Sequence, residues 1–317
     1  MNQDRFKITE FREALGHWFK QNGRALPWRE TWDPYSILVS ELMLQQTQVS
    51  TVTGYYRDWF KRFPTLRDLA NADESDVLLA WQGLGYYARA RNLHKSAKIL
   101  VERNNAIFPS AVDELLGLPG IGRYTAGAIT SFAFDLPAPV VDANVQRVVS
   151  RLLNIRKPID EPTVVRKIWD FADQYARGLN PRILNSALME LGATVCLPRR
   201  PLCSRCPVRS FCVARNPEEL PIKKARQKIE RRTEAHIFSL REGHILLQQS
   251  AGRRWHGLWI LPALQPKPGF DYEAAVCRPL LGLNYSITRY VVCLNIFRAG
   301  PPTALSRWPS WRAWPMR

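Results

Sequence analysis

Hydrophobic residues recur every three or four positions over the first two thirds of the chain. Between residue 7 and about residue 195, apolar side chains follow this spacing in segments such as 37–44, 77–80 and 93–100. Short breaks that contain proline or glycine separate these segments. A spacing of three and four is typical of helices with one buried face, whereas strands alternate apolar and polar residues. The pattern predicts an all-α domain of many short helices.

The pattern changes in the last third of the chain. HIFSL-REG-HILLQQ, with Gly243 between two apolar runs, predicts a hairpin, and residues 284–297 predict another strand. Residues 216–232 contain prolines and then dense charge, which is typical of a linker between domains. The expected organisation is a helical domain over 1–195, a cysteine-bearing loop over 196–215, a linker over 216–232 and a small, strand-rich domain over 233–317.

The net charge of the chain indicates the class of partner that it binds. The 317 residues carry a formal charge of +17, and the sequence pI is about 10.0. Such an excess favours a polyanion such as DNA, with an anionic membrane surface as the alternative. No apolar run approaches the roughly 20 residues that span a bilayer, and the N-terminus does not have the pattern of a secretory signal. We therefore expect a cytoplasmic, nucleoid-associated protein with reduced cysteines and no membrane partner.

Four cysteines gather in one short stretch, separated by six, two and five residues. Under reducing conditions such a group is expected to bind metal rather than to form disulfides, and it fits a structural zinc ion or an iron–sulfur cluster. Four arginines lie among these cysteines and would suit contacts with phosphate. The expected metal ligands are Cys196, Cys203, Cys206 and Cys212.

A glycine-containing turn, GLPGIGR, lies at 117–123. It is close to a P-loop, but Arg123 and Tyr124 occupy the places of its lysine and its hydroxyl residue. Gly120 and Gly122 permit positive φ between two helices, so backbone N–H groups would face outward at a helix N-terminus. Such a turn suits one phosphate of a DNA backbone, and a plain helix connection is the alternative.

Two carboxyl groups, Glu41 and Asp142, lie within the helical part of the sequence. Glu41 lies on an otherwise apolar helical segment, SELMLQQTQV, where burial would favour the protonated form. Asp142 follows the glycine turn by about twenty residues, in VVDANVQRV. A protonated carboxyl group and an ionised one together can supply general acid–base chemistry. A partnered structural glutamate is the alternative for Glu41.

Together these motifs resemble the MutY-type adenine DNA glycosylases of the endonuclease III superfamily. The cysteine spacing after ALMELGATVC resembles the [4Fe–4S] loop of that superfamily, and residues 115–130 resemble its helix–hairpin–helix motif. The resemblance extends from about residue 8 to residue 215. It implies one [4Fe–4S] cluster and a mainly α fold. In that fold a helical glycosylase domain is followed by a small, apparently shortened α+β Nudix-like domain.

The resemblance also implies roles for individual residues. Glu41 would be the general acid, Asp142 the stabilising carboxylate and Asn144 their positioning residue. Tyr124 stands where strand-cleaving relatives carry a Schiff-base lysine, which implies base removal without strand cleavage. The implied adenine pocket contains Trp28, Arg29, Leu44, Tyr124 and Glu190. The implied DNA contacts, with Tyr86 as the wedge, are Gln46, Thr47, Tyr86, Gly120, Gly122 and Thr288.

The segment after the wedge, GLGYYARARNLHKSA, contains several basic residues. Arg89, Arg91 and Lys95 fit either phosphate contacts or a solvated helix face. His94 is expected on the surface of the helix. The sequence favours neither interpretation of the three basic residues.

The resemblance weakens in the C-terminal domain. RRWHGLWILPAL resembles the G-L-W-x-x-P segment of the Nudix-like domain, yet no Nudix hydrolase box follows it. The loop of the form H-x-F-[ST]-H that reads the lesion has its nearest match at 285–289, with Thr288 in the hydroxyl position and no flanking histidine. The implied lesion reader is therefore an altered one.

The implied activity is removal of adenine opposite 8-oxoguanine or guanine in duplex DNA, by a monomer. One alternative is a pyrimidine-lesion glycosylase/lyase of the endonuclease III type, against which Tyr124 and Glu41 argue. Another is a non-catalytic DNA-binding iron–sulfur protein. The presence of both Glu41 and Asp142 argues against that alternative.

Overall fold

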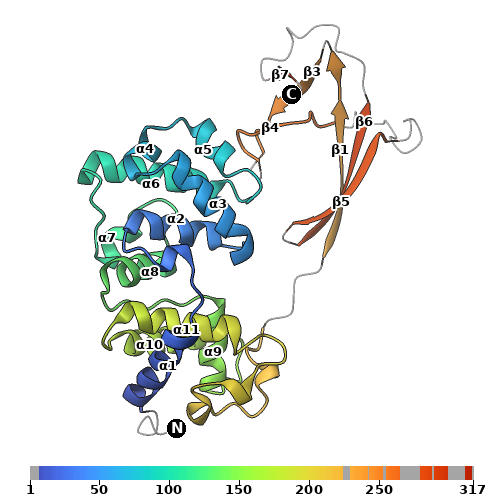
Figure 1. Cartoon of the computed structure of the whole chain (residues 1–317). Coiled ribbons are helices and arrows are strands. Elements are labelled where there is room, and N and C mark those ends of the chain that lie inside the picture. Colours follow the sequence, from blue (N-terminus) through green and yellow to red (C-terminus); the bar gives the residue numbers. More distant parts are fainter. Residues whose placement is uncertain are drawn as a thin grey trace. The chain divides into compact units, whose positions relative to one another are not determined.

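The chain forms two compact units, Met1–Lys224 and Ala225–Arg317 (Figure 1). The computed structural model describes residues 7–223, 229–241, 243–252, 255–264, 279–287 and 289–298, and the backbone of 311–315. The boundary between the units falls within the segment 216–232, which the sequence assigns to a linker. Leu220, at the start of that segment, is buried in the first unit, where its carbonyl accepts a hydrogen bond from Arg151.

The first unit is helical, as the hydrophobic spacing predicts. None of the helices in the described part of the chain is long and apolar enough to cross a membrane. Short 3-10 helices are found at Pro27–Arg29, Cys203–Arg205, Arg209–Phe211 and Pro217–Glu219. The α-helices of this part are α1 Ile8–Asn22, α2 Pro34–Leu44, α3 Val49–Arg62, α4 Leu66–Asn71, α5 Glu74–Ala80, α6 Ala88–Asn104, α7 Val112–Leu116, α8 Arg123–Phe134, α9 Ala143–Leu152, α10 Pro162–Ala176 and α11 Pro181–Thr194.

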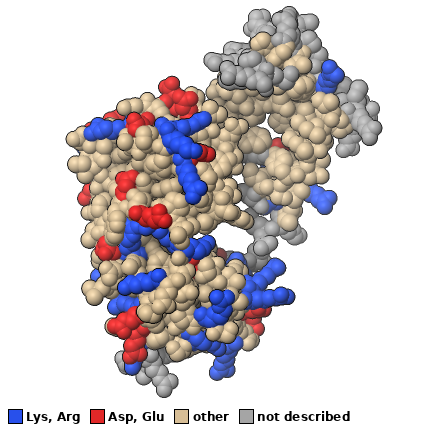
Figure 2. Space-filling model, viewed as in Figure 1, with Lys and Arg blue, Asp and Glu red and all other residues tan. Residues whose placement is uncertain are grey.

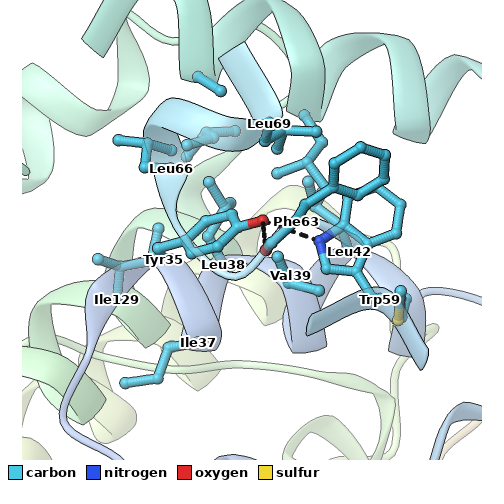
Figure 3. Close-up of a cluster of buried hydrophobic side chains, with 14 of the residues drawn as sticks. Tyr35, Ile37, Leu38, Val39, Leu42, Trp59, Phe63, Leu66, Leu69 and Ile129 are labelled. Carbon is cyan, nitrogen blue, oxygen red and sulfur yellow. Dashed lines mark hydrogen bonds between the residues drawn. The ribbon is translucent and has the colours of Figure 1, made fainter. Parts of the chain in front are cut away.

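Two hydrophobic cores divide the helical unit into two lobes. The core of the first lobe runs from Leu26 to Ala133 and is built mainly by α2–α8. Within this core, the Tyr35 hydroxyl donates to the Phe63 carbonyl and accepts from the Trp59 indole, each at 2.9 Å (Figure 3). The core of the second lobe joins α1 to α9–α11 and to the cysteine loop.

The second unit contains two sheets. In one, β1 Glu230–Phe238 pairs in parallel with β6 Tyr290–Arg298, which pairs antiparallel with β5 Leu281–Ile287. In the other, β3 His244–Gln249 pairs antiparallel with β2 Leu240–Arg241, β4 Trp259–Ile260 and β7 Trp311–Pro315. The described residues of this unit form strands and turns without a helix.

Two expectations for this unit have different outcomes. The hairpin at Gly243 is present between β2 and β3, and Gly243 has a φ of 75°. The single strand expected over 284–297 is wrong, because Ile287 and Tyr290 pair across a turn and divide the segment between β5 and β6. The apolar residues on both sides of this turn concealed it in the sequence.

Candidate active site

A cavity of about 750 Å³ lies in the helical unit and is lined by residues from both lobes. The sequence-predicted catalytic and pocket residues all line it, together with two of the expected DNA contacts. These residues are Trp28, Arg29, Glu41, Leu44, Gln46, Thr47, Tyr124, Asp142, Asn144 and Glu190. Side chains that are more than 160 positions apart in the sequence, such as Trp28 and Glu190, thus share one cavity.

Glu41 lies on α2, in which each residue from Tyr35 to Met43 except Ser36 has an exposed fraction of 3% or less. Its own side chain is 3% exposed, and its Oε2 atom has no hydrogen-bond partner. Burial raises the pKa of Glu41 to about 7; the hydrogen bond with Tyr124 opposes this shift, and the charge of Asp142 adds to it. A carboxyl group with this pKa holds its proton near neutral pH and can release it there.

Tyr124 occupies the second position of α8, next to the glycine turn. Its hydroxyl is hydrogen-bonded with Glu41. Burial raises the pKa of Tyr124 well above the ordinary value, and the charges of Glu41 and Asp142 raise it further. The phenol therefore stays protonated and acts as a donor to the Glu41 carboxyl group. It carries no amine with which to form a Schiff base.

Asp142 is the N-cap residue of α9, and each of its carboxylate oxygens has a donor. Oδ1 accepts from the backbone N–H of Val145, and Oδ2 accepts from the Asn144 amide, both at 2.7 Å. Burial raises the pKa of Asp142, while these donors and the charge of Arg147 act in the opposite direction. The helix N-terminus and the two donors hold the carboxylate in one orientation at the cavity wall.

A buried arginine, which the sequence interpretation missed, supports this wall. Arg147 donates through Nη2 to Asn144 Oδ1 and to the Gly192 carbonyl, and through Nε to the Cys196 carbonyl, each at 2.8 Å. A Cβ atom on Gly192 would lie 2.6 Å from Cβ of Asn144, so α11 can approach α9 this closely only with glycine there. Arg147 lies among the buried residues Val145, Val148 and Val149, but charge alone suggested a surface position.

Glu190, on α11, is fully buried and paired with two arginines. Arg24 donates to it through Nε at 2.6 Å and Nη2 at 3.0 Å, and Arg29 donates through Nη2 at 2.8 Å. Burial alone would raise the pKa of Glu190, but the Arg24 hydrogen bond and the Arg29 charge bring it below the ordinary value. The sequence interpretation included Arg29 and missed Arg24, whose nearness to the LPWR segment was the available signal.

The cysteine loop fits a polynuclear cluster. The four thiols are free and partly buried, and Cys196, Cys206 and Cys212 pack against the core of the second lobe. Burial raises the pKa of Cys206 to about 11, and the charges of the other three cysteines add to it, so the four sulfurs are neighbours. In the described residues no His, Cys, Asp or Glu group is arranged to hold a single metal ion.

The surface of this loop is basic. Its four arginines are exposed, and Figure 2 shows basic side chains over the lower part of the helical unit, where Figure 1 places the loop. Beneath them, the Arg151 guanidinium donates to Cys196 Sγ at 3.3 Å and to the Leu197 carbonyl at 2.7 Å. The loop thus presents cations outward on a framework that a buried arginine holds in place.

The glycine turn packs on α6 and lies outside the cavity lining. Gly120 has a φ of 77°, and a Cβ atom there would lie 2.6 Å from Cβ of Asn92, so only glycine fits. Gly122, for which positive φ was expected, is instead the extended N-cap of α8 with a φ of −97°. Ser96 Oγ donates to the Pro119 carbonyl at 3.0 Å and fixes the turn.

The remaining expectations concern the surface around the wedge. Tyr86 is 52% exposed, as a wedge must be. Arg89 is only 8% exposed, so it is neither a phosphate contact nor part of a solvated face, and Arg91 is paired with Glu74. The expectation that His94 lies on the surface is wrong, because its side chain is 2% exposed and burial lowers its pKa. Thr288 lies outside the described residues.

Two family profiles match the chain. The profile of the HhH-GPD superfamily of base excision DNA repair proteins matches residues 39–174. That of the iron–sulfur binding domain of endonuclease III matches residues 196–212. The second match supports a [4Fe–4S] cluster rather than zinc, and the matched segment contains all four clustered cysteines.

Individual proteins agree with these profiles. An adenine DNA glycosylase of Homo sapiens is 46% identical over 222 residues, or 67% of this chain and 41% of that protein. One of Buchnera aphidicola subsp. Schizaphis graminum is 32% identical over 265 residues, or 82% of this chain and 76% of that protein. A thermostable thymine-DNA glycosylase structure aligns with a TM-score of 0.61 and 27% identity, covering 67% of this chain and 98% of that one. The chain spans about two fifths of the length of its mammalian relatives.

Proposed function

Because the chain belongs to the adenine DNA glycosylase family, we propose that it removes adenine mispaired with 8-oxoguanine or guanine in duplex DNA. The observation that carries the proposal is the pair of carboxyl groups in one cavity. Glu41 has a pKa of about 7 and an oxygen without a partner, whereas both oxygens of Asp142 accept hydrogen bonds. Such a pair can supply an acid and an anion at the same pH.

The proposed reaction begins with adenine extruded from the helix into the cavity. Glu41 donates its proton to N7, the bond between C1′ and N9 breaks, and its electrons leave with the base. The Asp142 carboxylate stabilises the positive charge that develops on the sugar. Glu41, now ionised, takes a proton from a water molecule as that water attacks C1′. The products are adenine and an abasic sugar, and the carboxyl groups return to their initial states.

Recognition of the base is assigned to other residues that line the cavity. Trp28 and Leu44 supply apolar surface for the faces of a purine. Glu190 is kept ionised by Arg24 and Arg29, which donate to both of its oxygens, and would fix these two arginines at the edge of the base pocket.

DNA contacts are assigned to three surfaces of the helical unit. The backbone N–H groups at the N-terminus of α8 and the exposed arginines of the cysteine loop would each bind phosphate. Tyr86 and Gln46 would fill the space that the extruded base leaves, because stacking and pairing lost there cost a few kcal/mol. With Tyr124 in place of a lysine, the enzyme is expected to leave the DNA backbone intact.

The proposal gives the other two parts of the chain supporting roles. The [4Fe–4S] cluster, held by Cys196, Cys203, Cys206 and Cys212, would order its loop for docking on DNA. The second unit would act as a Nudix-like reader of the base opposite adenine, on the resemblance of RRWHGLWILPAL and of residues 285–289. For the cluster, purified protein should be brown and contain iron and acid-labile sulfide; a colourless protein with zinc would refute this part.

The central experiment measures adenine release under single-turnover conditions. Three duplexes carry adenine opposite 8-oxoguanine, opposite guanine and opposite thymine, and strand scission is scored with and without alkali. Release from the two mispairs only, with scission only after alkali, is the expected result. Scission without alkali would indicate a glycosylase/lyase, and binding without release from any duplex would indicate a non-catalytic DNA-binding protein.

A further inference from the structure

Arg89 makes an unusual set of contacts for a charged residue on a helix. It lies at the start of α6 and is 8% exposed. Its Nη1 atom donates to the carbonyls of Leu42 at 2.7 Å, Met43 at 3.1 Å and Gln45. Its Nη2 atom donates to two further carbonyls, those of residues 84 and 85, at 3.0 and 3.2 Å. The five acceptors therefore belong to two separate segments of backbone.

The first of these segments is the C-terminal end of α2. The last carbonyls of a helix lack partners within it and carry the negative end of the helix dipole, so a buried cation is favourable there. The residue directly after the bonded carbonyl of Gln45 is Gln46, which is exposed and has a left-handed backbone with a φ of 61°. Arg89 thus fixes the backbone immediately before an exposed side chain that lines the cavity.

The second segment has the same arrangement. The residue directly after the bonded carbonyl of Gly85 is Tyr86, which is exposed and also left-handed, with a φ of 46°. The Arg89 guanidinium lies 5.4 Å from the centre of the Tyr86 ring and 5.3 Å from that of the buried Trp81 ring. Trp81 in turn donates to the Gly85 carbonyl at 3.1 Å. Left-handed backbone is uncommon for residues other than glycine and persists only where its surroundings hold it.

We propose that Arg89 is the positioning residue that holds Gln46 and Tyr86 as a two-pronged wedge, one guanidinium fixing the backbone behind both side chains. The inference rests on the proposed function, because a wedge has a purpose only if a base leaves the duplex. Arg89 itself does not contact DNA. It sets the distance and direction between two side chains that enter the duplex beside the extruded adenine, so that the space is filled in one step.

The geometry requires a planar fork rather than a positive charge alone. Nη1 donates to carbonyls at the end of α2, and Nη2 donates to carbonyls of the segment before Tyr86. A lysine has a single ammonium group, which cannot occupy both places. Arg89→Lys therefore keeps the charge and the helix but breaks the link between the two segments, so the backbone behind both prongs is no longer fixed. Arg103→Lys is the matched control, because Arg103 is an exposed residue in the last turn of the same helix.

The first test compares adenine release opposite guanine with release opposite an abasic site, where adenine has no partner and extrusion costs less. Arg89→Lys should lower the single-turnover rate at the mispair about tenfold or more and at the unpaired adenine much less. The pH profile should be unchanged, because Glu41 and Asp142 are untouched. An equal loss on both substrates, or no loss, would overturn the proposal. Arg103→Lys should match the wild type on both.

A second measurement needs no activity and separates failure of this proposal from failure of the proposed function. Amide hydrogen exchange on the free protein should become faster in residues 42–47 and 83–87 together in Arg89→Lys, with the cores of both lobes unchanged. If the wild type releases no adenine and these two segments still loosen together in Arg89→Lys, the proposed function is refuted. The role of Arg89 in fixing both segments is then supported. If only one segment loosens, or if exchange becomes faster throughout the lobe, the proposed role of Arg89 is refuted.

Discussion

The two lobes of the helical unit each contribute one carboxyl group to the cavity, and they treat it in opposite ways. The first lobe buries Glu41 in the middle of α2, where one oxygen has no partner and the pKa rises to about 7. The second lobe places Asp142 at the N-terminus of α9, where both oxygens accept hydrogen bonds at 2.7 Å. One lobe stabilises the neutral form, and the other supplies donors to the charged form.

This difference shows how a mainly helical fold can obtain an acid and an anion from the same functional group. A helix interior offers a side chain no free N–H group, so a carboxyl group there loses hydration without compensation. A helix N-terminus offers free N–H groups and the positive end of the dipole. In the proposed mechanism, position along a helix rather than residue type assigns the two roles, and three substitutions probe the assignment.

The largest effect is expected for Asp142→Asn. Asparagine is as good an N-cap as aspartate, so α9 should begin where it does now, but the negative charge near the sugar is lost. Base release should fall by about 10³-fold or more. Duplex binding, measured separately, should be retained, and Asp173→Asn, at an exposed ion pair on α10, serves as the control. Loss of binding together with release would make Asp142 a structural residue.

Glu41→Gln should have the next largest effect. The amide has nearly the shape of the carboxyl group but cannot protonate N7, and loss of a general acid lowers rates by about 10²- to 10⁴-fold. Single-turnover release from an adenine–guanine duplex measures the loss, and Glu102→Gln, an exposed position on α6, controls for the substitution itself. A rate within a few-fold of wild type would show that another group protonates the base.

Glu41→Gln should also become more stable relative to the wild type as the pH rises from acidic to slightly alkaline values. The folded pKa of Glu41, about 7, lies above the ordinary value of 4.5, so ionisation opposes folding once the pH exceeds 4.5. Between about pH 4 and about pH 8, the free energy of unfolding of Glu41→Gln should improve relative to wild type by up to about 3 kcal/mol. Denaturant unfolding at both pH values tests this, and a constant difference would mean that the carboxyl group is not desolvated.

The smallest effect is expected for Tyr124→Phe. In wild type, release should fall as the pH rises above about 7, because Glu41 loses its proton. The Tyr124 hydrogen bond lowers the pKa of Glu41, so its removal should move this alkaline limb to higher pH, with less than about a tenfold change in rate at neutral pH. Rate profiles of both proteins over the same buffers measure the shift. A limb that moves to lower pH would contradict the assignment of Glu41 as the acid.

The features that depend on short stretches of sequence could be predicted from the sequence alone. Helical spacing predicted the first unit, and the apolar neighbours of Glu41 predicted a desolvated acid, because burial of a helix can be read from its own residues. The cysteine spacing indicated the metal loop in the same way. The resemblance implied that Asp142 and Glu190 serve the same site as Glu41, which no local pattern could show.

The arginines that hold the site together could not be predicted with the same ease. Arg24, Arg89 and Arg147 are held by backbone carbonyls or by a carboxylate far away in the sequence, and charge alone places such residues on the surface. A signal existed for Arg89, since it shares the buried spacing of Leu93 and Ala97 on α6. A cation on a buried stripe predicts a polar partner in the fold, although it does not identify that partner.

The second lobe joins the two ends of the helical unit. Phe11 of α1 is fully buried and packs edge-on against Phe171, Tyr175 and Phe211. During synthesis, the segment that becomes α1 leaves the ribosome first but has no partners until about two hundred residues have followed. The first lobe can close in the meantime. The core around Glu41 thus ends at Ala133, whereas the core that carries α9 and Asp142 needs residues from both ends of the helical unit.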